Sequence, residues 1–221
     1  MTFQRARSDE QRAVRRRAIL ETTSAMLDEM PVAQVTLNEL SRRVGLAKTA
    51  VLRYFESREA VLLDLMDDRM TTWLAELEPE LARGIDPGRS AEERAEQAAD
   101  VLSRSLAAQT VLCDLFGAQG GVLEHNVSVE VVKRHKRSSH AKLVTMVELV
   151  RRHLPEVGDG AQTFCLMSLI SAGALAAYDP PPPSLLAAYA DEPDLGVLRL
   201  DLRDALRTSC SAALVGVLPR A

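Results

Sequence analysis

The stretch VGLAKTAVLRYF, residues 44–55, carries four side chains that can bind a polyanion: Lys48, Thr49, Arg53 and Tyr54. Lysine, threonine and arginine donate hydrogen bonds to base edges and to phosphate oxygens, and the tyrosine hydroxyl can reach the sugar-phosphate backbone. Ala47 precedes them, and small residues at this point let the backbone approach a grooved partner closely. The chemistry that this stretch favours is recognition of a nucleic acid.

The rest of the chain shows no set of residues that predicts catalysis or metal binding. No nucleophile–base pair with an orienting group, no phosphate-binding glycine loop and no dinucleotide motif occurs in the sequence. His135 and His140 are five positions apart and so lie off a common helix face, and no two of the histidines, His125 included, share a tight ligand spacing with a carboxylate. We expect no enzymatic activity, no metal site and no cofactor.

Composition indicates a cytoplasmic protein with no membrane segment. No apolar run approaches the roughly 18 residues needed to span a bilayer, and the N-terminus lacks the apolar segment of a signal peptide. The three cysteines, Cys113, Cys165 and Cys210, are far apart and set in apolar helical patterns. We therefore expect buried, reduced thiols and no disulfide framework.

Charge is divided unevenly along the chain. Residues 1–60 hold 11 Lys and Arg against 8 Asp and Glu, a net charge of +3. The remaining 161 residues hold 16 against 23, a net charge of −7. A basic head on an acidic body is typical of a nucleic-acid-binding domain joined to a part that does not touch nucleic acid.

Hydrophobic periodicity predicts an all-α fold, because no strand-like alternation persists anywhere. Two capping boxes, Thr36–Glu39 and Ser90–Glu93, mark helix starts, and Ser57 is expected to cap the long helix that follows it. Pro79 is expected to end or kink a long helix, and the prolines at 180–183 predict a stiff, non-helical connector. The expected helices cover residues 11–29, 37–44, 47–55, 57–78, 90–108, 110–119, 128–154, 160–178 and 201–217.

Two of these helices form a predicted helix-turn-helix. Gly45 separates helix 37–44 from helix 47–55 and can adopt the left-handed conformation that ends a helix sharply. Leu40 and Val51 are placed to pack the two helices together. In such a motif the second helix enters the major groove, and its N-terminal residues contact the bases.

Residues 15–75 also resemble the tetracycline-repressor-like (TetR) regulators. The matching pieces are Ile19-Leu20, Thr36 before the second helix, ELSRRVGL at 39–46 and, most specifically, YFESREAVL at 54–62. The resemblance implies an N-terminal three-helix DNA-binding domain over residues 1–56. It also implies a C-terminal helical bundle for ligand binding and dimerisation over residues 57–221.

The resemblance places DNA contacts on residues of the second and third helices and their flanks. Thr36 and Arg58 would bind phosphates, and Lys48 and Thr49 would read bases. Family members often have a phosphate-binding tyrosine where this chain has Leu52, so that contact is absent or supplied by a neighbour. Arg5 and Arg7, ahead of the expected first helix, and Arg12 at its start either add an arm on the DNA or stay disordered. The implied contacts are Thr36, Arg43, Ala47, Lys48, Thr49, Ala50, Arg53, Tyr54 and Arg58.

In the C-terminal bundle, the expected effector pocket rests on scarce aromatic and methionine residues. In the mechanism that the resemblance implies, an effector shifts helix 57–78, changes the separation of two recognition helices and releases the DNA. The identity of this small molecule stays open, and so does the choice between repressor and activator. The expected pocket residues are Met66, Met70, Trp73, Phe116, His125 and Phe164.

Small residues on helices 160–178 and 201–217 allow close helix contact. In a monomer this would be ordinary packing, whereas the resemblance implies a homodimer in which the two helices pair with their symmetry mates. Such a dimer would bind a palindromic operator in double-stranded DNA with half-sites roughly 34–36 Å apart. The alternative is a helical ligand-binding or interaction module without operator binding. The expected interface residues are Ser168, Ala172, Gly173, Ala176, Ala205, Ser209, Ala212, Ala213 and Gly216.

Overall fold

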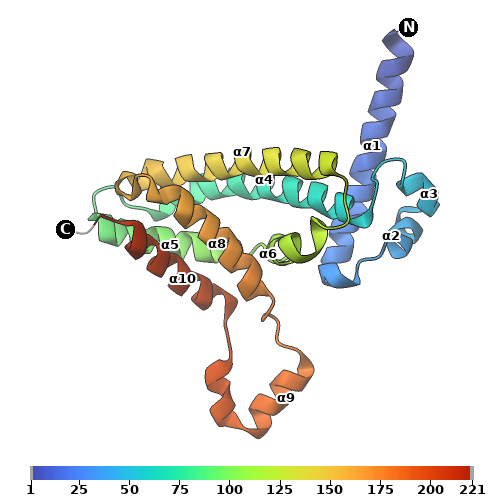
Figure 1. Cartoon of the computed structure of the whole chain (residues 1–221). Helices are drawn as coiled ribbons and strands as arrows, with labels where there is room; N and C mark the ends of the chain where they lie inside the picture. Colours follow the sequence, from blue (N-terminus) through green and yellow to red (C-terminus); the bar gives the residue numbers. More distant parts are fainter. Residues whose placement is uncertain (1, 220–221) are drawn as a thin grey trace. The chain divides into compact units, whose positions relative to one another are not determined.

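The computed structural model describes residues 2–219, with side chains from residue 10 to 219, and every regular element in that range is helical (Figure 1). This confirms the all-α prediction. The helices are α1 (Thr2–Leu27), η1 (Val32–Gln34), α2 (Leu37–Val44), α3 (Lys48–Val51), α4 (Arg58–Gly84), α5 (Ala91–Ala107), α6 (Thr110–Ala118), η2 (Gln119–Leu123), α7 (Val129–His153), η3 (Pro155–Val157), α8 (Gly160–Ala176), α9 (Pro183–Asp191), η4 (Pro193–Leu198) and α10 (Leu202–Val217).

The chain divides into two compact units. The first consists of the residues up to Arg69 together with Ala118–Ser139, and the second of Met70–Gly117 with His140–Ala221. The first unit therefore contains more than the expected domain of residues 1–56, because the first turns of α4 and of α7 group with α1, α2 and α3.

In the first unit α2 packs against both α1 and α3, and the core is built from side chains of all three helices (Figure 1). Ile19 and Met26 of α1, Leu40 of α2 and Val51 of α3 are completely buried. Phe55 closes the core at the end of the turn that follows α3 and is 3% exposed. Burial of these apolar side chains provides the main stabilisation of the helix-turn-helix.

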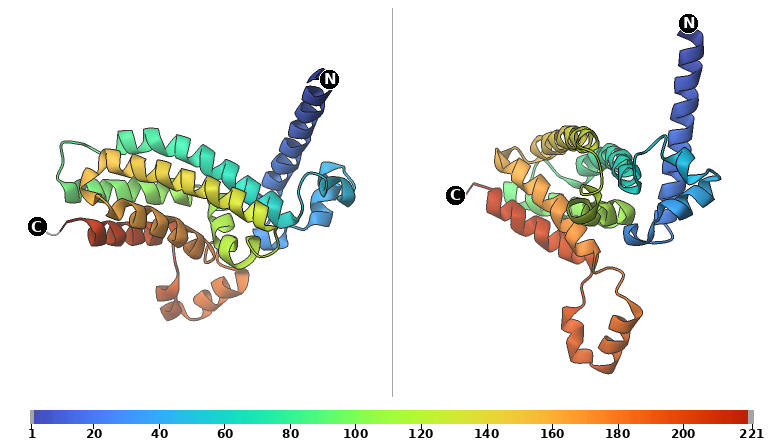
Figure 2. Two further views of the ribbon diagram at one scale, coloured as in Figure 1. Left: turned by 45° about the horizontal axis from the view of Figure 1, so that its top comes forward. Right: turned by 45° about the vertical axis from the view of Figure 1, so that its right-hand side comes forward.

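In the second unit α10 packs against both α5 and α8, and the three helices lie side by side in Figures 1 and 2. A close approach of backbones joins α6 to α8. A Cβ atom added to Gly173 would lie 2.6 Å from the backbone nitrogen of Gly117, and one added to Gly117 would lie 2.8 Å from the carbonyl oxygen of Gly173. The two glycines therefore serve packing within the chain.

Between α8 and α10 the chain forms an extension that includes α9 and η4. Figures 1 and 2 both show it leaving the ends of α8 and α10, and it has no buried residue from Ala174 to Asp201. The expected connector of four prolines is only partly correct. Pro183 begins α9, since proline suits the first helical position, where a backbone N–H has no partner.

Two other helix boundaries differ from the sequence prediction. Helix α1 begins at Thr2, so the backbone at Arg5, Arg7 and Arg12 is helical and does not form an extended arm. Helix α4 continues through Pro79 to Gly84. Pro79 is exposed, and the Nε of Arg83 donates a hydrogen bond to its carbonyl oxygen at 3.1 Å, which supports the last turn.

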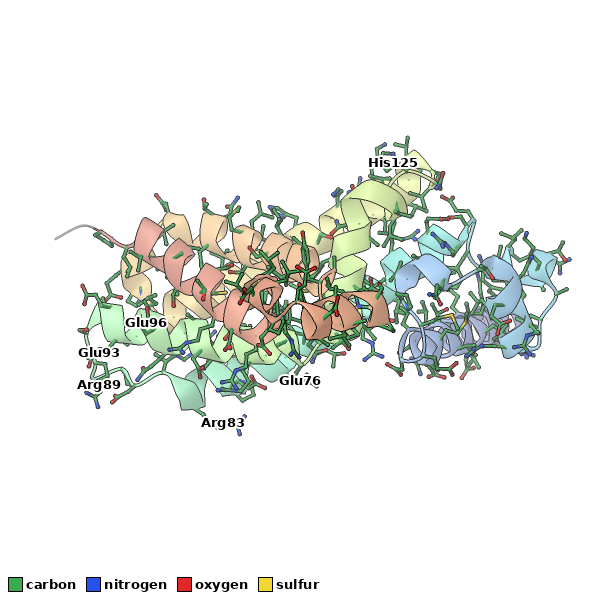
Figure 3. All side chains as sticks on the ribbon, turned by 90° about the horizontal axis from the view of Figure 1, so that it is seen from below. Glu76, Arg83, Arg89, Glu93, Glu96 and His125 are labelled. Carbon is green, nitrogen blue, oxygen red and sulfur yellow. The ribbon has the colours of Figure 1, made fainter. Side chains whose placement is uncertain are left out.

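The predicted caps of α4 and α5 are confirmed. Ser57 accepts a hydrogen bond from the N–H of Ala60 at 3.1 Å, and Ser90 and Glu93 form a reciprocal capping box. Glu93 also pairs with Arg89, whose side chain lies beside it at the start of α5 (Figure 3).

No single helix in the described range is long and apolar enough to span a bilayer; α5 with Thr110–Leu123 passes the length and composition test as a pair but is bent by 86°.

Candidate nucleic-acid interface

The turn between α2 and α3 has the conformation that the sequence predicts. Gly45 has φ 69° and ψ 30°, the left-handed conformation that glycine adopts without steric cost. The N–H of Leu46 donates to the carbonyl of Ser41 at 3.0 Å, and the N–H of Gly45 donates to that of Arg42 at 3.3 Å. These bonds close the end of α2 and direct the chain into α3.

Helix α3 is shorter than expected. Its α-helical part is Lys48–Val51, and the chain continues to Tyr54 in tighter turns, with the N–H of Arg53 bonded to the carbonyl of Ala50. The side chains at the start of α3 face solvent, because Val51 anchors the opposite side of the helix in the core. Of the predicted DNA contacts, Ala47, Lys48, Thr49 and Arg53 are exposed, and Ala50 and Tyr54 are half-buried.

The N-terminus of α2 is capped by Thr36, whose hydroxyl accepts a hydrogen bond from the N–H of Glu39 at 3.2 Å. The carboxylate of Glu39 accepts hydrogen bonds from Arg42 and Arg43, and these bonds lower its pKa to about 2. Arg43 also pairs with Glu29 at 2.8 Å. Thr36 and Arg43 are thus part of the framework of α2 as well as predicted phosphate contacts.

Arg58, a predicted phosphate contact, is already held by two contacts within the chain. Its Nη1 donates to the carbonyl oxygen of Val35 at 2.9 Å, and its Nη2 lies 3.1 Å from a carboxylate oxygen of Glu59. The Arg58 side chain is 20% exposed. It ties the residue before Thr36 to the start of α4, a structural role that sequence reasoning missed.

A groove of about 780 Å³ lies between α1 and the residues that follow α3. Arg12, Arg15, Arg53 and Tyr54 contribute to its lining, and the guanidinium carbon of Arg12 lies 5.9 Å from the centre of the Tyr54 ring. A concave surface with several arginines suits a phosphodiester chain. Arg15 was not among the predicted contacts, since only the fold shows that its face of α1 adjoins Arg53 and Tyr54.

The six expected effector-pocket residues are distributed over both units. Met66 and His125 belong to the first unit, and the other four belong to the second. His125 is exposed after η2, where its side chain faces solvent (Figure 3), so its burial in an apolar pocket is not found. Trp73 is completely buried, and its Nε1 donates to the hydroxyl of Ser105 at 3.0 Å. The remaining three are Met70 and Phe164, which are buried, and Phe116, which is half-buried.

His135 is a buried histidine on α7. Its Nε2 lies 3.1 Å from the amide nitrogen of Gln119, which also donates to Glu124, so Nε2 acts as the acceptor of a neutral ring. Its Nδ1 is buried and has no hydrogen-bond partner in the described part of the chain. Burial lowers the pKa of His135, and the nearby carboxylate of Glu124, 3.8 Å away, opposes that shift.

The nine residues of the expected dimer interface differ in exposure. Ser168, Ala172 and Gly173 are buried within their own chain. Of the other six expected residues, Ala212 and Gly216 are exposed, and Ala176, Ala205, Ser209 and Ala213 are half-buried.

The solvent-facing surface of α8 is polar at Gln162 and Thr163 and apolar from Leu166 onward, and the helix contains no charged residue. Its large exposed side chains are Leu166, Met167 and Ile170, which is 54% exposed, and Val215 of α10 is 68% exposed. A hollow of about 310 Å³ between the two helices includes Ser209, Ala213 and Gly216 in its lining. Sequence reasoning sought small residues here and missed these larger ones.

The cysteines are buried, as the sequence predicts. Burial raises the pKa of Cys113 and Cys165 to about 12 and also raises that of Cys210. Among the described residues, no cluster of three or more His, Cys, Asp or Glu side chains could hold a metal ion.

Comparison with protein-family models gives two matches that together span most of the chain. Residues 19–65 match the model described as bacterial regulatory proteins, tetR family. Residues 67–221 match the model described as tetracyclin repressor-like, C-terminal domain.

A curated relative and several solved structures are similar to the chain. The HTH-type transcriptional regulator EthR of Mycobacterium tuberculosis is 38% identical over 50 residues, which cover 23% of this chain and 23% of that protein. FadR of Thermus thermophilus, solved in complex with lauroyl-CoA, has a TM-score of 0.57 at 19% identity, over 93% of this chain and 96% of that one. A TetR transcriptional regulator of Rhodococcus sp. RHA1 has a TM-score of 0.54 at 19% identity, over 95% and 98%. FadR of Bacillus subtilis with stearoyl-CoA has a TM-score of 0.54 at 12% identity, over 90% and 98%.

Proposed function

Because the chain belongs to the TetR family of transcriptional regulators, we propose that it is a ligand-responsive repressor that binds a palindromic DNA operator as a homodimer. Such a protein acts in the cytoplasm, where the bacterial chromosome lies. The proposal is supported by the helix-turn-helix at Leu37–Val51 and by the sequence similarity of a 50-residue stretch of the chain to EthR.

The observation that carries the DNA-binding part is the arrangement of α3. Gly45 turns the chain so that Val51 is buried while Ala47, Lys48 and Thr49 face solvent at the N-terminal end of the helix. In helix-turn-helix proteins this end contacts base edges in the major groove. The arginines of the groove beside Tyr54 are suited to bind the adjacent phosphates.

The dimer is proposed to form through the uncharged face of α8 and the neighbouring face of α10. Leu166, Met167 and Ile170 present a contiguous apolar surface that would be costly to leave in water. A twofold axis through this surface would bring the same side chains of both subunits together, and α8 has no charged residue that would repel its copy. Two recognition helices could then read both halves of a palindrome.

The effector is proposed to bind in the second unit, near Trp73. Trp73 and Phe164 supply buried aromatic surface. The hydroxyl of Ser105, which accepts a hydrogen bond from Trp73, is a polar group that could bind an effector instead. Fatty acyl-CoA thioesters are the first compounds to test, because two FadR proteins of the same fold were solved with such ligands.

The test of the proposal is selection of bound sequences from a random pool of duplex DNA. A palindromic consensus is expected, with affinity that falls steeply with salt because several phosphates are contacted. Lauroyl-CoA and stearoyl-CoA would then be added to the preformed complex. Binding that shows no preferred sequence at any salt concentration would favour the alternative, a helical module without an operator.

A further inference from the structure

Two arginines of α1, one helical turn apart, contact the backbone at the end of the recognition segment. Arg12 donates from Nη2 to the carbonyl oxygen of Arg53 at 3.3 Å. Arg16 donates from Nη1 to the carbonyl oxygen of Tyr54 at 2.5 Å. All four residues belong to the first unit.

These carbonyl groups need external donors because of how α3 ends. The α-helical part stops at Val51, and the N–H groups of Arg53 and Tyr54 bond back to Ala50 and Val51 through tighter turns. The carbonyls of Arg53 and Tyr54 lie beyond that helical part. A guanidinium placed there donates a charge-assisted hydrogen bond to each of them.

Arg16 makes two further contacts that fix its position. Its guanidinium carbon lies 4.1 Å from the centre of the Phe55 ring, within cation–π distance. Its Nη2 pairs with one carboxylate oxygen of Asp64 in α4. The other carboxylate oxygen of Asp64 accepts a hydrogen bond from Arg134 of α7 at 3.0 Å.

We propose that Arg16 is a positioning residue for DNA recognition, which holds the end of the recognition segment through Tyr54 and Phe55, and that Asp64 holds Arg16 in place. Because Arg134 fixes the other oxygen of Asp64, the first turns of α4 and α7 together support this contact. The inference takes DNA binding by the family as its premise and adds a residue that acts without touching the DNA.

The competing role for Arg16 is a direct contact to phosphate. The geometry disfavours a phosphate contact. Nη1 of Arg16 is hydrogen-bonded to the carbonyl of Tyr54, Nη2 is paired with Asp64, and the side chain is 31% exposed. Arg17, the next residue of α1, is exposed and carries the same charge. It therefore provides a matched control for loss of one positive charge from this part of the helix.

The first measurement uses the DNA-free full-length protein, so it does not depend on an operator. Hydrogen–deuterium exchange is followed in peptides covering residues 47–57 for the wild type, Arg16→Met, Asp64→Asn and Arg17→Ala. Exchange in this segment should become about tenfold faster in Arg16→Met and Asp64→Asn, the effect of losing one charge-assisted hydrogen bond. Arg17→Ala should exchange as the wild type does, and Arg16→Lys should restore part of the protection.

The second measurement is affinity for the selected operator and for random duplex DNA over a range of salt concentrations. A positioning role predicts that Arg16→Met loses about tenfold in operator affinity while the slope of log affinity against log salt is unchanged. Unchanged exchange in both Arg16→Met and Asp64→Asn would overturn the inference. A salt slope reduced by about one, with equal loss on operator and random DNA, would also overturn it and assign Arg16 to a phosphate.

Discussion

The carboxylate of Glu56 accepts hydrogen bonds from both the backbone N–H and the hydroxyl of Ser128, at 2.5 Å and 2.8 Å. Ser128 caps α7, since its hydroxyl also accepts from the N–H of Val131 at 3.4 Å. Glu56 therefore completes a helix cap from 72 positions away in the chain, where a capping box would use a residue of the helix itself.

Loss of this long-range cap should lower the free energy of unfolding. Glu56→Ala and Ser128→Ala should each cost about 1 kcal/mol, the usual effect of removing a cap. The double variant should cost less than the sum, because both changes remove the same interaction. Urea unfolding of the four proteins measures this coupling, and additive losses would show that the two residues act separately.

Changing Lys48 and Arg58 to alanine should have different effects on DNA affinity and thermal stability. Lys48 is exposed at the start of α3, so Lys48→Ala should weaken operator binding by about 1–3 kcal/mol if the residue reads a base, with no change in thermal unfolding. Arg58 bonds to Val35 and Glu59, so Arg58→Ala should lower the unfolding temperature as well as the affinity. Equal losses on operator and random DNA for Lys48→Ala would exclude base reading.

Ile170 and Gly173 lie on the same helix, but substitution of the first should affect dimerisation and substitution of the second should affect fold stability. Ile170→Asp places a charge on the exposed face of α8 and should dissociate the dimer without unfolding the chain. Gly173→Ala forces a Cβ against Gly117 and should destabilise the fold by about 1–3 kcal/mol. Sedimentation and thermal unfolding of both variants test this, and an intact Ile170→Asp dimer would place the interface elsewhere.

Trp73 should report effector binding, because it is the only tryptophan and is completely buried. A compound that releases the operator should change the emission of Trp73. Ser105→Ala removes the acceptor of the indole N–H and should alter the emission without the compound. A compound that releases DNA while the Trp73 emission stays constant would place the effector site elsewhere.

His135 should make stability fall on mild acidification. Its pKa is lowered in the folded protein by burial, so below the ordinary histidine value of about 6.5 the unfolded chain binds the proton more readily. The free energy of unfolding should therefore decrease as pH falls from about 7 towards 5. Glu124, Asp64 and Asp67 oppose the pKa shift and Lys136 reinforces it.

The pH test compares His135→Gln with His140→Gln, an exposed histidine of the same helix. His153, whose pKa is also lowered, contributes in the same direction to all three proteins. The slope of stability against pH should become shallower only in His135→Gln. An equal slope in the wild type and His135→Gln would show that the ring is not forced to stay neutral.

The sequence alone determined the features that depend on neighbours within about four residues. The helical periodicity, the caps at Thr36, Ser57 and Ser90 and the turn at Gly45 were all predicted, and the structure has each of them. Local signals suffice there because a cap or a left-handed turn is formed by the residues that encode it. Of the two outcomes expected at Pro79, an end or a kink of the helix, the end was wrong, because local propensity does not decide a helix supported by its surroundings.

Only the tertiary structure decided which residues act together across the chain. Arg16 and Asp64 are 48 positions apart, and Asp64 and Arg134 are 70 apart. Nothing in their local sequence distinguishes them from other surface charges. Gly173 was expected to make a close helix contact, and the structure places that contact on Gly117 of the same chain. A small residue indicates that two backbones approach each other but does not identify the second one. Packing of distant segments brings such groups into contact, so their roles follow from the fold and not from spacing.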